Sequence, residues 1–223
     1  MVNIYELLTS LPLFNGASYN SVSELVAKTK LHFLKYAKDD TVINAGDSCD
    51  SISFVISGAV RSTIEGDCFS VSQTLKAPDV LSPEFLFGKA PFSPCTVTAV
   101  EPAGIMKISK IDYLRLLESD KVFMLNFLNV LSMNAQKTVK VAVDGTGYSA
   151  RHSIARLIIS LTKQGGEDIS LACTQGELHS VFGVSPVELT KALDAMTACG
   201  ILEYSSRGIK VLSRRALLDI LIQ

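Results

Sequence analysis

The sequence predicts an α+β protein made of an antiparallel β-roll, one long helix, and two short helices followed by a hairpin. Short apolar or β-branched runs alternate with turn residues up to residue 110, which is the pattern of antiparallel strands. No glycine or proline interrupts residues 111–143, and two capping motifs with a glycine between them follow residue 173. With 48% hydrophobic and 19% charged residues among 223, the composition is typical of a globular protein.

Residues 1–110 are expected to form the roll, after an N-terminal helical stretch. Gly46-Asp47 and Gly66-Asp67 mark turns, because glycine adopts positive φ without strain. Ser57-Gly58 is expected to close a hairpin between two apolar runs. The predicted strands are Thr41–Asn44, Ile52–Ile56, Ala59–Ile64, Phe69–Leu75, Cys95–Val100 and Gly104–Ile108.

Residues 111–144 are expected to form one continuous helix that carries a dimer interface. One row of side chains recurs at alternating spacings of three and four, as in a coiled-coil seam: Leu125, Leu128, Ser132, Ala135, Val139 and Ala142. A second row is expected to pack on the roll: Met124, Phe127, Leu131, Asn134, Thr138 and Val141. The alternative is a helix buried inside a monomeric domain.

A polar, glycine-rich break at Asp144–Gly147 precedes the last part of the chain, residues 145–223. We expect a hinge at this break, because nothing in it favours regular structure. Beyond it, the pattern predicts a helix over Tyr148–Lys163 and a short strand over Asp168–Leu171.

Two capping boxes then follow, Thr174 with Glu177 and Ser185 with Glu188, in which a hydroxyl and a carboxylate satisfy backbone N–H groups. Gly183 lies between them, where a tight turn needs positive φ. Two short capped helices joined by a glycine turn predict a helix-turn-helix, whose second helix enters the major groove of DNA. Taken alone, the pair could also be a helical hairpin without any role in DNA binding.

The hairpin predicted after these helices favours DNA binding, because its basic turn, Ser205–Gly208, resembles a wing. The candidate DNA-contacting residues are Ser185, Val187, Thr190, Lys191, Arg207 and Lys210. Lys191 and Thr190 are suited to a base edge or a phosphate, and Val187 to a thymine methyl group. Arg207 and Lys210 would contact phosphates, and Glu188 is expected to cap its helix rather than read cytosine.

Net charge, composition and the motifs that are absent argue against several other classes of protein. The net charge is −1, so a basic DNA-binding face must come from the arrangement of charges. The 5 cysteines form no C-x-x-C pair, which favours a reducing cytoplasm over a disulfide framework. No apolar run approaches the ~18 residues of a membrane helix. With 3 histidines and no H-x-H, G-x-S-x-G or phosphate-loop motif, we expect neither an enzyme nor a metal site.

Along nearly its full length the sequence resembles the cyclic-AMP receptor protein / fumarate–nitrate regulator (CRP/FNR) family of bacterial transcription factors. Residues 46–60 are similar to the family's glycine-acidic-apolar signature, and residues 174–200 to its DNA-reading unit. The resemblance implies a jelly-roll, cyclic-nucleotide-binding-like sensor domain, a dimerisation helix and a winged helix-turn-helix. It also implies a homodimer on a palindromic operator, with RNA polymerase as a further partner.

Two departures from the family pattern limit what can be transferred. Glu84 can stand for the glutamate that holds a cyclic nucleotide, but Ser93 or Pro94 occupies the place of the phosphate-binding arginine. Without that charge-matched partner we expect no tight cyclic-nucleotide binding. Pro186 and Val187 replace polar residues of the reading helix, so the target sequence cannot be inferred. The candidate effector-binding residues are Glu84, Phe85, Phe87, Phe92, Cys95 and Thr96.

The effector itself stays open. The three phenylalanines of this set would suit an apolar ligand or simply pack in the core. An iron–sulfur cluster is not expected, because the first cysteine is Cys49 and no N-terminal cluster exists. Haem would need an axial ligand such as His32, a methionine or a cysteine, although a lone histidine is more often structural. We therefore predict a cytoplasmic DNA-binding transcription regulator, with a sensor that acts through a protein partner as the rival hypothesis.

Overall fold

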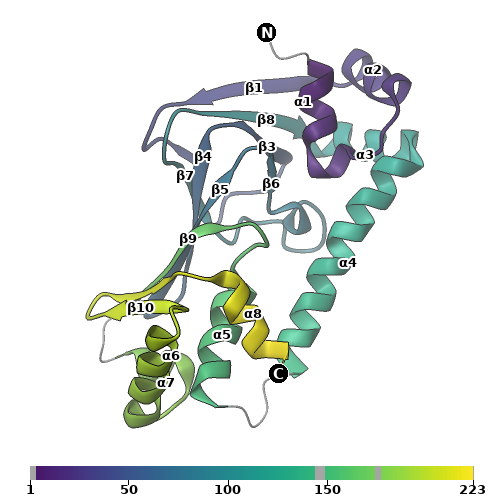
Figure 1. Ribbon diagram of the computed structural model, residues 1–223. Helices are drawn as coiled ribbons and strands as arrows, with labels where there is room; N and C mark the ends of the chain where they lie inside the picture. Colours follow the sequence, from purple (N-terminus) through teal and green to yellow (C-terminus); the bar gives the residue numbers. More distant parts are fainter. Residues whose placement is uncertain (1–3, 144–148, 174–176, 223) are drawn as a thin grey trace. The chain divides into compact units, whose positions relative to one another are not determined.

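The computed structural model describes residues 4–143, 149–173 and 177–222 (Figure 1). The chain forms two compact units, and each unit is made of two separate stretches of the sequence. The first unit comprises Met1–Arg61 and Leu75–Ala135, and the second comprises Ser62–Thr74 and Gln136–Gln223. The domain boundaries expected at residues 110 and 144 stay a prediction.

The first unit is built on two groups of antiparallel strands. A four-stranded sheet has the order β1 (Leu31–Tyr36), β8 (Ala103–Ser109), β3 (Ser51–Ser57) and β6 (Asp79–Leu81). Beside it, β2 (Thr41–Ile43) pairs with β7 (Thr96–Ala99), while β4 (Ala59–Glu65) and β5 (Phe69–Lys76) continue into the second unit. The helical elements are α1 (Ile4–Ser10), η1 (Pro12–Phe14), α2 (Tyr19–Lys28), η2 (Pro83–Phe85), α3 (Lys110–Ser119) and the first part of α4 (Lys121–Val143), whose residues from Gln136 on belong to the second unit.

The six predicted strands are confirmed to within one residue at each end, whereas β1 and β6 were not predicted individually. The exposure of β1 explains why this strand was not predicted. Its four central residues are all exposed, so the apolar–polar alternation that marks a half-buried strand is missing. Strand β1 is instead held by its pairing with β8, from Leu31 opposite Ile108 to Tyr36 opposite Ala103.

The prediction of one continuous helix over residues 111–144 was wrong, because the chain leaves the helix at Asp120. This residue is extended, with φ −143° and ψ 127°, and it separates α3 from α4. Its carboxylate accepts a 2.8 Å hydrogen bond from the backbone N–H of Val122 and caps the helix that follows. A hydrogen bond from Ser21, followed by that of Val122, lowers the pKa of Asp120. An aspartate can therefore break a helix where no glycine or proline is present.

Aromatic side chains connect α4 to the core of the first unit. Phe14 lies between Phe54 and Phe123, with ring centroids 5.5 Å away in both edge-to-face contacts. Phe127, one helical turn beyond Phe123, contacts the ring of Tyr113 at 5.5 Å. Phe123 and Phe127 are almost fully buried, so this face of α4 belongs to the core.

The second unit combines helices with antiparallel strands at one end of a seven-stranded sheet (Figure 1). Its elements are α5 (Ala150–Leu161), β9 (Glu167–Cys173), α6 (Leu178–Phe182), α7 (Pro186–Ala198), β10 (Leu202–Ser205), β11 (Gly208–Val211) and α8 (Arg214–Ile222). The strands lie in the order β10, β11, β9, β5. Strand β5 contributes Val71, which is 2% exposed, to a core that includes Ile158, Leu193 and Met196. The tip of the β4–β5 hairpin is thus an integral part of this unit.

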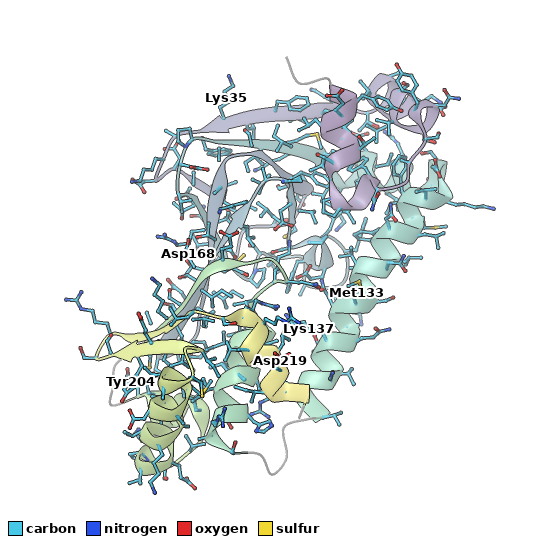
Figure 2. The ribbon with its side chains drawn as sticks, in the orientation of Figure 1. Lys35, Met133, Lys137, Asp168, Tyr204 and Asp219 are labelled. Carbon is cyan, nitrogen blue, oxygen red and sulfur yellow. The ribbon has the colours of Figure 1, made fainter. Side chains whose placement is uncertain are left out.

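Two cations lie at the C-terminal end of α5. The side chain of Lys137 (Figure 2) donates a 2.6 Å hydrogen bond to the carbonyl oxygen of Thr162, and Arg214 donates one of 3.3 Å to the same atom. Positive charge at this end of a helix is favourable, because it meets the negative end of the helix dipole. Burial lowers the pKa of Arg214. These contacts hold the last part of α4 and the start of α8 against the end of α5.

Candidate functional site

The turn between α6 and α7 has the conformation that the sequence predicted. Gly183 ends α6 with φ 64° and ψ 33°, in the left-handed region where other residues are strained. The backbone N–H of Val184 then bonds to the carbonyl of His179 at 3.1 Å. The expected capping box of α6 begins at Thr174, which lies outside the described residues. Glu177 itself is the N-cap and makes no capping bond with its side chain.

The capping box at the start of α7 is confirmed. The hydroxyl of Ser185 accepts a hydrogen bond from the backbone N–H of Glu188, and the Glu188 carboxylate accepts one from the backbone N–H of Ser185, both at 3.3 Å. The Ser185 hydroxyl also donates to Glu188 Oε2 at 2.7 Å. These bonds, the side-chain one first, lower the pKa of Glu188, with a smaller contribution from Lys191. Glu188 therefore serves as a cap.

The two faces of α7 differ sharply in burial. Leu189, Leu193 and Met196 are buried in the core of the unit. On the opposite face Val187 is 64% exposed, and Lys191 is exposed one turn later. The hydroxyl of Thr190 donates to the carbonyl of Pro186 at 2.9 Å, which leaves its lone pairs and methyl group toward solvent. The outer face of α7 thus presents an apolar side chain, a hydroxyl and one ammonium group.

The hairpin after α7 is tight. Ser205 pairs with Gly208, so only Ser206 and the exposed Arg207 form the turn. Gly208 has φ 132°, and a Cβ atom placed there would lie 2.0 Å from the carbonyl oxygen of Leu171 on β9. Only glycine fits at this point, where β11 crosses close to β9.

A hydrogen bond connects the hairpin to the helix in front of it. The hydroxyl of Tyr204 (Figure 2) donates to the Asp194 carboxylate on α7 at 2.6 Å. This bond raises the pKa of Tyr204. On the same hairpin Lys210 stands opposite Glu203 in the strand register, and both are exposed. The carboxylate weakens the positive field of Lys210, whereas Arg207 lies in the turn, outside the paired residues of the hairpin.

The side chains predicted to form the dimer interface lie on the exposed face of α4. Leu125 is 55% exposed, Leu128 48% and Val139 61%, and Ser132 and Ala135 are also exposed. The side chain of Ala142 lies outside those described. Of the second row, Phe127 is buried and Leu131 packs against the core of the first unit, whereas Met124 is 41% exposed. The helix therefore has one apolar face in the core and another open to solvent.

The residues predicted to bind an effector differ in their surroundings. Glu84 is exposed and accepts a 3.3 Å hydrogen bond from Asn134 of α4. Phe87 contacts the ring of Phe127 at 5.8 Å, whereas Phe92 is 53% exposed. Phe85 is half-buried in η2, and Cys95 is buried. The hydroxyl of Thr96 accepts a hydrogen bond from the backbone N–H of Ala45 at 3.2 Å.

A small hollow of about 20 Å³ inside the roll is lined by other residues. Four serines and a cysteine contribute polar atoms to it: Cys49, Ser51, Ser53, Ser82 and Ser93. Cys95 lies just behind this lining, because its Sγ is 3.8 Å from the Ser82 hydroxyl and 3.9 Å from that of Ser93. Sequence reasoning missed this lining, although serines at positions 51 and 53 of an apolar strand were a signal for it.

In the part of the chain that the structure describes, no group of three or more His, Cys, Asp or Glu side chains is placed to hold a metal ion. None of the helices in that part is both long and apolar enough to cross a bilayer.

Two domain families match the sequence. The cyclic nucleotide-binding domain matches residues 33–120, and the Crp-like helix-turn-helix domain matches residues 153–220. The first match runs from β1 to the end of α3, and the second from α5 into α8. Together they include the roll, the helix pair and the hairpin. No curated protein sequence matches the chain.

Solved structures show the same fold. The catabolite activator protein of Thermus thermophilus is 17% identical with a TM-score of 0.51, and the match covers 94% of this chain and 97% of that one. A mutant of CooA from Carboxydothermus hydrogenoformans is also 17% identical, with a TM-score of 0.52 and 95% of each chain covered. At this level of identity the similarity establishes the fold alone.

Proposed function

Because the chain belongs to the CRP/FNR family of transcription regulators, we propose that it binds double-stranded DNA as a homodimer, under the control of an effector sensed in the roll. The observation that carries this proposal is the two-sided burial of α7. Its inner face is fixed in the core while Val187, Thr190 and Lys191 remain exposed beside a capped, rigid N-terminus. A helix presented in this way can enter the major groove.

Each exposed residue then has a role in DNA binding. Lys191 contacts a base edge or a phosphate, Thr190 a base edge or a phosphate, and Val187 a thymine methyl group. Arg207 at the tip of the hairpin contacts the backbone and sets the position of α7 without reading sequence. The hydrogen bond from Tyr204 to Asp194 keeps hairpin and helix in one arrangement, so both sets of contacts form together.

The exposed row on α4 supports the homodimer. A stripe that includes Leu125, Leu128 and Val139 is costly to leave in water, and a second copy of the helix would cover it. Two reading helices related by a twofold axis meet a palindromic operator with half-sites about 34 Å apart. The effector changes the arrangement of the two helices and therefore this spacing.

Features of the roll support an effector other than a cyclic nucleotide. The hollow of about 20 Å³ is far below the ~300–1,000 Å³ of typical ligand pockets. Ser93 and Pro94 provide no guanidinium for a phosphate, and Glu84 is engaged with Asn134. No axial ligand for haem is assigned, because His32, the histidine considered for that role, is exposed on β1. We place the protein in the cytoplasm, where it meets DNA and RNA polymerase and where a structural disulfide framework is not expected.

A second function is favoured by two observations on the same surface. Val187 puts an apolar side chain at the tip of the reading helix, and Glu203 stands opposite Lys210 on the hairpin. A surface of this kind could bind a protein instead of DNA. The two functions differ in their response to salt, because DNA binding releases counterions and weakens steeply as salt is added.

Recovery of bound genomic fragments tests the proposal. The tagged full-length protein is mixed with sheared DNA from the organism that encodes it, and the retained fragments are sequenced. We expect enriched fragments that share an inverted repeat with about 10 base pairs between half-site centres. Equal recovery of all fragments at low and moderate salt would contradict the proposal.

A further inference from the structure

Two cysteines that are far apart in the sequence lie side by side in the second unit. Cys68 directly precedes β5, and Cys173 is the last residue of β9. These strands pair with Phe69 opposite Cys173 and Ser70 opposite Ala172. An open hollow of about 490 Å³ is lined by both cysteines, together with Glu65, Glu177 and Arg207 among others.

The two cysteines are neighbours at one end of the β5–β9 pair, because Cys68 directly precedes Phe69, the residue opposite Cys173. A residue in this place of a regular strand would face away from Cys173. Cys68 lies in the turn before β5 instead, and both cysteines line the same hollow. Burial first, and the neighbouring Cys68 thiol second, raise the pKa of Cys173.

We propose that Cys68 and Cys173 are an oxidant-sensitive thiol pair, which hydrogen peroxide converts into a disulfide that fastens the β4–β5 hairpin to the base of the β10–β11 hairpin. Cys68 is half-buried and lines the hollow, whereas Cys173 is only 8% exposed. Their exposures assign Cys68 as the residue that reacts with peroxide and Cys173 as the residue that resolves the product.

The chemistry balances with peroxide as the only oxidant. The Cys68 sulfur attacks one peroxide oxygen, the O–O bond breaks, and a sulfenic acid and one water form. The Cys173 sulfur then displaces the hydroxyl group, so that an S–S bond forms, the S–O bond breaks, and a second water leaves. Two thiols and one hydrogen peroxide thus give one disulfide and two waters. A dithiol reductant such as dithiothreitol reverses the reaction by exchange.

The bond would act on the hairpin that carries Arg207. The backbone N–H of Cys173 donates to the carbonyl oxygen of Arg207 at 3.4 Å, and Cys173 packs in the core of the unit. Turning its side chain toward Cys68 takes the thiol out of that core, next to the base of the β10–β11 hairpin. This consequence rests on the proposed DNA binding, and we expect oxidation to lower the affinity for duplex DNA by about fivefold or more.

Peptide mapping tests the bond without any need for DNA. Trypsin releases Cys68 in peptide 62–76 and Cys173 in peptide 164–191, and each contains no other cysteine. After brief exposure of the folded, reduced protein to hydrogen peroxide, we expect these two peptides joined by a disulfide and separated again by dithiothreitol. The linked pair should disappear in Cys68→Ser and Cys173→Ala and persist in Cys199→Ser, whose replaced thiol is exposed elsewhere in the unit.

The remaining outcomes separate the two proposals. If Cys68 and Cys173 remain unlinked while Cys199 joins two chains, or while Cys49 and Cys95 of the roll join instead, the thiol-pair proposal fails. It also fails if the linked protein binds duplex DNA as tightly as the reduced protein. If the reduced protein binds no DNA, the proposed function fails, and the peptide map still decides whether the thiol pair exists.

Discussion

Asn134 on α4 donates a 3.3 Å hydrogen bond from its Nδ2 to Oε2 of Glu84, the acidic residue of η2. Glu84 lies in the segment that the sequence marked for effector binding, and Asn134 lies next to the exposed row of the same helix that we propose as the dimer interface. The bond is therefore a direct physical connection, inside the first unit, between the candidate sensor loop and the candidate dimer helix.

This connection can be measured by a double-mutant cycle. Glu84→Ala and Asn134→Ala each remove the bond, so the two changes together should cost less stability than their sum. We expect a coupling free energy of about 0.5–1.5 kcal/mol in urea unfolding. Glu84→Gln keeps an acceptor oxygen and serves as the matched control, with a smaller loss. Additive effects of the two alanine changes would show that the contact contributes nothing to stability.

Gly208 is predicted to be irreplaceable in the hairpin. In Gly208→Ala the new methyl group would lie 2.0 Å from a backbone oxygen of β9 at a positive φ, whereas Gly165→Ala adds a methyl group at φ 88° with nothing within 4 Å. Both variants bear the backbone strain of about 1–3 kcal/mol, and only the first bears the clash. Urea unfolding should therefore rank Gly208→Ala as clearly the less stable. Equal losses for the two variants would rule out the close approach of β11 to β9.

The capping box makes a prediction about pH. The pKa of Glu188 is lowered in the folded protein, chiefly by the Ser185 hydroxyl, from the ordinary value of 4.5. The unfolded chain therefore takes up the proton first as pH falls. The resulting stabilisation is complete above the ordinary pKa and is lost as pH falls through the folded value. In Ser185→Ala, NMR titration of the Glu188 carboxyl carbon should show the pKa moving up toward 4.5. An unchanged titration curve would contradict the assignment of the cap.

The exposed row on α4 predicts the oligomeric state. Ala135→Asp places a charge in the centre of the proposed interface, and sedimentation velocity should show monomers at concentrations where the unchanged protein is dimeric. Asn129→Asp is the matched control, because Asn129 is exposed on the same helix but outside the row. If Ala135→Asp remains dimeric, another face of the chain forms the interface.

Local patterns explain why most of the fold could be predicted. The capping box of α7, the glycine turn at Gly183 and the two-residue hairpin turn before Gly208 depend on side chains within a few residues of one another. Such signals are readable from sequence because the atoms that interact are neighbours in the chain. The six predicted strands have the same origin, since each alternates or clusters its apolar residues between turn residues.

Features that depend on distant residues were missed for the opposite reason. The pairing of β5 with β9 joins Ser72 to Ser170, whose hydroxyls are 2.9 Å apart, across 98 residues of sequence. Strand β1 is exposed along its centre and is fixed only by β8. Asp120, where the helix breaks, is hydrogen-bonded by Ser21 of another helix. The candidate effector residues were chosen from one continuous segment, whereas the hollow in the roll is lined from several strands and loops.

The central claim is that the outer face of α7 contacts DNA, and fluorescence anisotropy with an enriched genomic duplex tests it most directly. We expect Lys191→Ala to weaken binding by about 1–3 kcal/mol and, if the contact is to a phosphate, to reduce the slope of log affinity against log salt by about one. Lys35→Ala, an exposed lysine on β1 (Figure 2), should leave both quantities unchanged. If Lys191→Ala binds the duplex as tightly as the unchanged protein at every salt concentration, the proposed interface is wrong.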